Sequence, residues 1–487
     1  MRRLPVALVL LVAAGCVTPA PGSSPPAGEV PQTEYDAIEA AIGAPVVEDH
    51  DHGDPSLHEG SYDLDLVAAA TGYAEGGAPP QTSFVETAVK GGFAYICRSG
   101  PDEGLVIFDV SDIEAPVGVG YIHLDAGFEP DIEVSDDGKW AFWETQRLPG
   151  STPADPLDPA SAPGSTPYGI HIVDISDKAH PTWAGFTPVP PNGPHSITYA
   201  RIGDADYVFA SVYSWQYVGT SVGTPTLAPP QQQRLVIYKL DTSLPLARLV
   251  EVSSYIDEGA LGENPVTPTG GLMPHDVSVS IHPITGQTLA YVAYWDLGVV
   301  TLDVTDPAHP QKLSAFTDFG PATYRAVHMA RIFNGTIDGR VVLVVEPEIG
   351  GEADSGYMTF ADATDPANVT YLSSWLIPGN ITSGGGGLGP HYFDVLDGRV
   401  AMASYHAGFW IIDVHDATNL LHPRTVGYAL VNATGTSLPG PLGALGGGSS
   451  AFDAWWTKVE DQAYMVGGDV HAGLVVYKYT GPAPAQV

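Results

Sequence analysis

GLVIFDVSD, residues 104–112, is the most informative stretch for the fold, because it returns along the chain in six further versions. The others are GIHIVDISD (169–177), RLVIYKLDT (234–242), GVVTLDVTD (298–306), GYMTFADAT (356–364), GFWIIDVHD (408–416) and GLVVYKYTG (473–481), with starts 52 to 65 residues apart. Two short apolar runs joined by a tight turn precede the phrase, and several copies continue through a Pro-containing turn into another run. Each period therefore holds four strands, named a, b, c and d in chain order, with the phrase as strand c.

Four short antiparallel strands cannot bury both faces of their sheet alone, so repeats of this kind predict radial stacking. Seven phrases predict an all-β, seven-bladed β-propeller over residues 60–480, followed by a short C-terminal tail at 481–487. Because nothing strand-like follows the last phrase, the seventh blade lacks its outermost strand. The segment SYDLDLVAAATGY (61–73) has strand character and no blade of its own. We predict that it pairs with residues 473–479 and closes the ring, so that no open edge is left.

The phrase resembles the LVIVD-repeat family of extracytoplasmic β-propeller proteins, through LVIFDVSD, IHIVDISD, VVTLDVTD and FWIIDVHD. The resemblance implies the propeller fold and assigns no activity. The third, fifth and seventh copies depart from the pattern at the Asp of the "VD" pair. Where it is present, that residue (Asp109, Asp174, Asp303, Asp413) stands just before a turn, and Asp in such a place accepts backbone N–H groups. We interpret these four carboxylates as scaffold.

The N-terminus predicts export and lipidation. MRRLPVALVLLVAAGC (1–16) has two arginines, an apolar stretch too short to span a bilayer, and small residues before Cys16. It predicts a lipoprotein signal peptide ending in a lipobox, with a lipid on Cys16; the alternative is an ordinary cleavage site that leaves a thiol. Residues 17–59, first rich in Pro, Gly and Ser and then in His and Asp, predict a tether. We therefore expect an extracytoplasmic protein of the cell envelope, held by its lipid at the outer membrane or the cell surface.

Composition excludes several functions. The formal net charge of −37 disfavours nucleic acid, which needs Lys and Arg to replace its counterions. Only one cysteine besides Cys16 occurs, Cys97, so there is no disulfide framework. The chain carries no G-x-S-x-G elbow, P-loop, HExxH or EF-hand loop.

Function is expected where the blades differ. The long insertions (146–168, 214–233, 257–272, 346–355, 378–389 and 432–450) all fall in b–c or d–a connections, which emerge on one face of an antiparallel propeller. Binding residues concentrate on such loops. The first residues of strand a lie at the centre of that face, and blade by blade they are Val85, Asp131, His195, His275, His328, His391 and Phe452. Four histidines on consecutive blades are thus predicted to line one arc.

Two interpretations of this arc stay open. Each imidazole braces a neighbouring blade, or the imidazoles of His195, His275, His328 and His391 converge on a transition metal, with Glu346 or His406 as a further partner. Imidazoles with a carboxylate suit Zn, Cu or Fe. Other residues expected at the same face are candidates for ligand binding: Asp131, Trp295, Asp296, Tyr405 and His471. The sequence predicts a module that binds a protein, a glycan or a small molecule, with a metal-dependent oxidoreductase or hydrolase as the alternative.

Overall fold

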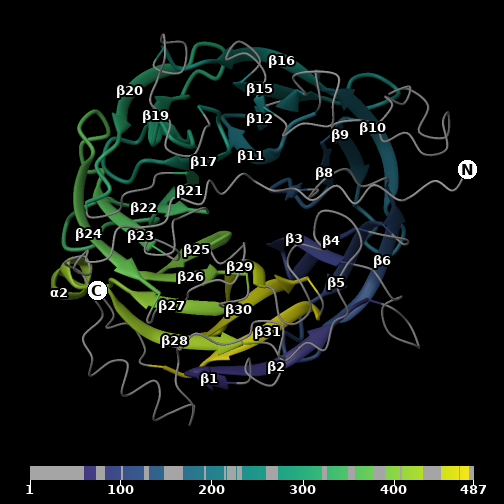
Figure 1. The fold of residues 1–487 in the computed structure, drawn as a ribbon. Helices are drawn as coiled ribbons and strands as arrows, with labels where there is room; N and C mark the ends of the chain where they lie inside the picture. Colours follow the sequence, from purple (N-terminus) through teal and green to yellow (C-terminus); the bar gives the residue numbers. More distant parts are fainter. Residues whose placement is uncertain are drawn as a thin grey trace, which may run out of the picture.

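The fold was obtained as a computed structural model of the 487-residue chain. It describes residues 60–72, 83–99, 103–124, 131–146, 168–190, 193–212, 215–216, 226–227, 233–258, 272–320, 326–348, 357–377, 390–405, 408–430, 451–470 and 472–481. Within these ranges seven antiparallel sheets stand in a circle (Figure 1). The seven-bladed β-propeller expected from the repeats is confirmed.

Strands a to d of a blade run from the axis outward. Blade one consists of β3 (Ser83–Lys90), β4 (Phe93–Ser99), β5 (Gly104–Asp109) and β6 (Val117–His123). Blade two consists of β7 (Ile132–Val134), β8 (Trp140–Thr145), β9 (Gly169–Asp174) and β10 (Thr182–Pro188). Blade three consists of β11 (Ser196–Ile202), β12 (Ala205–Val212), β15 (Arg234–Asp241) and β16 (Arg248–Tyr255). Blades four and five are β17 (Asp276–Ile281), β18 (Thr288–Ala293), β19 (Val299–Asp303), β20 (Gln311–Phe316); and β21 (Val327–Ile332), β22 (Val342–Pro347), β23 (Tyr357–Asp362), β24 (Thr370–Leu376). Blade six is β25 (Tyr392–Leu396), β26 (Arg399–Ala403), β27 (Phe409–Asp413), β28 (Arg424–Leu430), and blade seven begins with β29 (Ala451–Val459), β30 (Gln462–Asp469), β31 (Gly473–Tyr479). Two small elements are insertions: the hairpin β13 (Trp215–Gln216) and β14 (Thr226–Leu227) between β12 and β15, and helix α2 (Ala417–Leu421) between β27 and β28.

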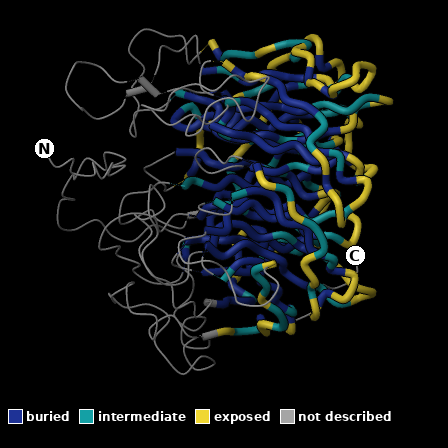
Figure 2. Tube along the Cα trace, turned by 90° about the vertical axis from the view of Figure 1, so that its right-hand side faces the viewer, coloured by how far each residue is buried: buried dark blue, intermediate teal, exposed yellow. Residues whose placement is uncertain are grey.

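The repeated phrase is apolar at four consecutive positions because both faces of a blade are buried. In β5, Leu105 and Ile107 pack in one cluster with residues of blade two, such as Trp143. Val106 and Phe108, which point to the opposite face, pack with residues of blade seven. The core is therefore a series of layers between blades, and Figure 2 shows buried positions running through the disc from face to face.

The aspartates of the phrase act as turn residues, as their position predicts. Oδ1 of Asp109, for example, accepts the N–H of Ser111 at 2.9 Å. The third and fifth blades, whose copies depart from the pattern, keep this bond through Asp241 and Asp362, which accept from Ser243 and Thr364. In these two blades only the place of the Asp within the phrase differs, and the turn itself is retained.

The N-terminal strand closes the ring. β2 (Leu64–Ala70) pairs antiparallel with β31 and supplies the fourth strand of blade seven, from Leu64 opposite Tyr479 to Ala70 opposite Leu474. The short strand before it, β1 (Gly60–Tyr62), was not expected to join another blade, yet it adds a fifth strand to blade six beside β28. Both strands lie at the rim of these two blades in Figure 1. The N-terminal segment thus pairs with both blade six and blade seven, and the chain then continues into blade one.

One face of the disc carries both the ends of strands b and the beginnings of strands a. An isolated bridge joins Trp295, just after β18, to Val327 at the start of the next blade, and another joins Tyr405 to Ala451. Most residues of the long insertions, which the sequence predicts on this face, lie outside the described ranges. Cys16 and the whole of 1–59 also lie outside them. No helix in the described part of the chain is long and apolar enough to cross a bilayer.

Candidate metal centre

The four histidines occupy one structural position in four consecutive blades. His195, His275 and His391 directly precede β11, β17 and β25. Their backbone N–H groups donate to the carbonyls of Ser211, Ala293 and Ala403, the corresponding residues of strand b, at 2.8, 2.7 and 2.9 Å. His328 sits in β21 at a bulge, between the pairs Val327–Pro347 and Met329–Glu346. Such a bulge turns the extra side chain out of the regular alternation.

The imidazoles form a continuous row, which we call the histidine arc. Ring centroids are 4.5 Å apart for His195 and His275, 4.4 Å for His275 and His328, and 4.6 Å for His328 and His391. His275, His328 and His391 are buried, with at most 4% of each exposed. Neighbouring members of this row are up to 80 residues apart along the chain, yet their rings are in contact.

The two interpretations of the histidines do not exclude each other, because each ring has two nitrogens. His391 braces its neighbour, since its Nδ1 lies 2.8 Å from the carbonyl oxygen of Phe452 at the same position in blade seven. His195 instead uses Nδ1 to contact a side chain, with Gln146 Oε1 at 3.0 Å. A neutral ring that donates through Nδ1 keeps a lone pair on Nε2. Bracing thus leaves the second nitrogen available as a ligand.

Two of these second nitrogens face each other. Nε2 of His195 lies 3.0 Å from Nε2 of His275. Two lone pairs at this distance repel unless a proton or a cation lies between them. Two nitrogens that bind one Zn²⁺ at about 2.0–2.1 Å are themselves about 2.8–3.4 Å apart for bond angles between 90° and 109°. The observed separation is that of a hydrogen bond in which one neutral ring donates its Nε2–H to the other, and it also fits two nitrogens that share a metal ion.

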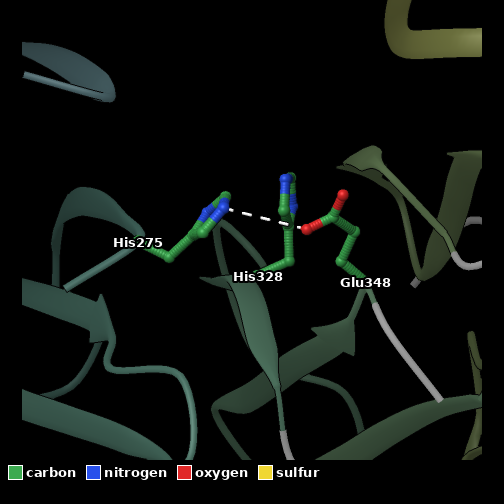
Figure 3. Close-up of side chains that lie close together, drawn as sticks. All are labelled: His275, His328 and Glu348. Atoms are coloured by element: carbon green, nitrogen blue, oxygen red, sulfur yellow. Dashed lines mark ion pairs between the residues drawn. The ribbon is translucent and has the colours of Figure 1, made fainter. Parts of the chain in front are cut away.

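A carboxylate completes the group. Glu348 Oε2 lies 3.8 Å from His275 Nε2, and one donor atom each of His275, His328 and Glu348 falls within 4.8 Å of the others. Figure 3 shows the Glu348 carboxylate pointing toward the two rings. The Tyr405 hydroxyl donates to Glu348 Oε1 at 3.0 Å and orients it. Among the described residues this is the group whose donor atoms are close enough to hold a metal.

Burial sets the charge of these groups. It lowers the pKa of His195 and of His391 to about 3. It also holds the pKa of His275 and of His328 well below the usual range, with a contribution from the neighbouring imidazoles. All four rings are thus neutral at neutral pH, the form that binds metals. Burial also raises the pKa of Glu348 to about 7, against the hydrogen bond from Tyr405.

A second circle of side chains surrounds the arc. Each member lies two residues after the end of strand b, the position that Ala293 has in blade four and Ala403 has in blade six. In four blades the members are Gln146, Trp295, Glu348 and Tyr405. Trp295 stacks on His275 with centroids 4.8 Å apart at an angle of 21°, and Tyr405 packs on His391 at 4.8 Å. The sequence predicted Trp295 and Tyr405 here but missed Gln146 and Glu348. Aligning strand b blade by blade, as strand a was aligned, would have found both.

Other predicted residues have different positions. Asp131, expected to bind a ligand, accepts the backbone N–H groups of Ile132 and Ile197 at 2.6 and 2.8 Å, so its carboxylate joins blades two and three. Asp296 is buried in the turn after β18. Glu346 is fully buried and its Oε1 lies 3.5 Å from His328 Nδ1. His406 and His471 lie outside the described residues. The assignment of a metal or ligand to any of these positions remains a prediction.

Fold and sequence together define the class: a seven-bladed β-propeller with a row of histidines at the centre of one face. The chain carries LVIVD repeats, which the family model matches at residues 86–122, 168–186 and 288–318. No curated protein matches the sequence.

Solved structures of similar shape are also β-propellers. The β-propeller domain of Cps50 (Swd1) from Myceliophteria thermophila has 10% identity and a TM-score of 0.48, over 85% of this chain and 99% of that one. The WD40 β-propeller domain of Doa1 has 10% identity and a TM-score of 0.46, over 86% and 97%. Sqt1 of Saccharomyces cerevisiae has 8% identity and a TM-score of 0.45, over 85% and 98%.

Proposed function

We propose that this propeller binds one transition-metal ion, Zn²⁺, Cu²⁺ or Fe²⁺, at the histidine arc. His275 and His328 each supply an imidazole nitrogen and Glu348 supplies a carboxylate oxygen, while His195 and His391 border the same space. The single observation that carries the proposal is that one donor atom each of His275, His328 and Glu348 lies within 4.8 Å of the others. Neutral imidazoles with one carboxylate form a donor set that these metals favour over Ca²⁺ or Mg²⁺, which take oxygen ligands.

The surroundings support a bound cation. Neither oxygen of Glu346 accepts a hydrogen bond from any described residue, although its side chain is fully buried. Burying a carboxyl group without hydrogen bonds costs free energy of folding unless a positive charge lies nearby. The carboxylate donor also has a partner that fixes its orientation, since the Tyr405 hydroxyl donates to Glu348, as is usual for metal ligands in proteins.

The wider role follows from the sequence. We propose a lipoprotein of the cell envelope, anchored through Cys16, whose face with the long loops brings a protein, glycan or small-molecule ligand to the metal. A bound ion of this kind would supply Lewis-acid or redox chemistry, so the metal-dependent enzyme is the second candidate; the histidine and carboxylate donors favour it over a loop surface that binds without metal.

Metal analysis of the purified full-length chain tests the proposal. We expect one ion per chain in the wild type and less than a tenth of that in the double variant His275→Ala, His391→Ala. The matched control is His282→Ala, since His282 is equally buried but bonds the carbonyl of Ala363 and the N–H of Thr285, within the scaffold. This control should lose stability and keep the metal. A wild type that binds no metal, with both variants merely less stable, would show that the histidines are scaffold.

A further inference from the structure

Glu346 is the least satisfied acid near the arc. It is 0% exposed, and within the described part of the chain neither carboxylate oxygen accepts a hydrogen bond. Its closest partner is His328, whose Nδ1 lies 3.5 Å from Oε1 and also makes no hydrogen bond there. Two buried polar groups thus face each other just beyond hydrogen-bond distance.

The fold itself does not require an acid at this position. Glu346 follows Val345, which pairs with Thr359, and the corresponding residues of the other blades are Cys97, Glu144, Ser211, Ala293, Ala403 and Gly468. Most of these are small. Glu144 of blade two is the other acid, and its Oε1 accepts the backbone N–H of Asp131 at 3.3 Å. Glu144 therefore has a backbone partner, whereas neither oxygen of Glu346 has a hydrogen-bond partner among the described residues.

We propose that Glu346 is a positioning residue for the metal, acting through His328. This inference rests on the proposed function. The carboxylate accepts the Nδ1–H of His328, which fixes the tautomer and leaves the Nε2 lone pair for the ion. When the ion withdraws electron density from the ring, the N–H becomes a stronger donor and the bond to Glu346 shortens. The buried carboxylate thereby acquires the positive partner that it lacks in the metal-free protein.

Glu346 and Glu348 have separate roles on this account. Glu348 lies within reach of both His275 and His328 and is a ligand. Glu346, two residues earlier, lies against Nδ1 of His328 at the bulge of β21 and touches the ion only through that ring. A positioning residue changes how tightly the ion is held but leaves the set of donor atoms unchanged.

The test compares full-length wild type, Glu346→Gln, Glu348→Gln and the matched control Glu144→Gln. Each protein is freed of metal with a chelator and titrated with Zn²⁺ for affinity and with Co²⁺ for its visible spectrum, and its metal-free melting temperature is recorded. We expect Glu346→Gln to bind Zn²⁺ about 10- to 100-fold more weakly, the usual effect of removing such a partner. Its Co²⁺ spectrum at saturation should match the wild type, whereas Glu348→Gln should alter the spectrum. Its metal-free melting temperature should be no lower than that of the wild type, because the substitution removes an unsatisfied buried acid.

Glu144→Gln should leave the Zn²⁺ affinity within about threefold of the wild type. If the wild type binds one ion and Glu346→Gln binds it equally well, the inference is wrong and the proposed function stands. A weaker affinity accompanied by a lower metal-free melting temperature would also overturn it, since that pattern indicates a structural role. A wild type without measurable affinity would overturn the proposed function, and this inference with it.

Discussion

Replacing Leu64 by alanine should destabilise the whole ring, since this residue seals the joint between its two ends. Leu64 is the first residue of β2 and is 0% exposed. It packs in one cluster with Phe409 and Ile411 of blade six and with Val475 and Tyr477 of blade seven. The side chain therefore fills the space between two blades at the point where the N-terminal strand completes the last one.

The strand also provides its own control. Leu66 lies two residues further along β2, pairs with Tyr477 and is 50% exposed. The same substitution at both positions removes the same atoms from the same strand. Leu→Ala at a fully buried site costs about 2–5 kcal/mol, whereas we expect about 1 kcal/mol or less at the half-exposed site. With an unfolding entropy of about 2.1 cal/mol/K per residue, a ring of roughly 420 residues loses about 3 °C in melting temperature for 3 kcal/mol.

Differential scanning calorimetry at one scan rate measures both variants against the wild type, which keeps the comparison valid even if unfolding is irreversible. Leu64→Ala should melt about 2–6 °C lower and Leu66→Ala about 1 °C lower or less. The cooperative transition should shift as a whole, because an opened ring exposes the core layers on both sides of the gap. Equal shifts for the two variants, or a separate early transition for Leu64→Ala, would refute closure by β2.

Three other predictions concern the scaffold. Deleting residues 60–73, which removes β1 and β2, should lower the melting temperature by more than either substitution and increase binding of a hydrophobic dye; melting like the full chain would contradict the closure. Asp303→Ala removes the acceptor for Thr305 N–H and for the Gln287 amide and should cost about 1 kcal/mol in urea unfolding, without changing metal content. Burial, as the main cause, and the charge of Asp131, as the second, raise the pKa of Glu133 to about 8. The folded state therefore keeps a proton that the unfolded chain releases above about pH 4, so the free energy of unfolding falls as the pH rises toward 8. Glu133→Gln should therefore melt higher than the wild type at pH 8 and equally at pH 4; the same difference at both pH values would show that titration of Glu133 is not the cause.

Much of the architecture followed from local pattern. A run such as Leu105–Phe108, apolar at every position, is needed only where a strand is buried on both faces, and its sevenfold return implied stacked blades. The spare strand at 61–73 implied closure because the last blade was one strand short. The aspartate turns were also predictable, but alignment of the phrase alone placed blades three and five outside the pattern. Asp241 and Asp362 keep the hydrogen bond in the turn, because hydrogen-bonded pairing with the neighbouring strands sets where strand c ends, whatever the position of the Asp within the phrase.

Which blades carry a histidine at the opening of strand a can be read from the amino-acid sequence, because each blade repeats the same local geometry and equivalent positions can be matched by counting. How close those rings come, and what lies beside them, depends on the folded ring. The His195–His275 contact spans 80 residues, and its 3.0 Å depends on how tightly two blades pack. The bulge at His328, the approach of Glu348 and the unsatisfied carboxyl of Glu346 likewise arise where separate blades or strands meet. Such contacts are set by the packing of the whole ring, which no local stretch of sequence contains.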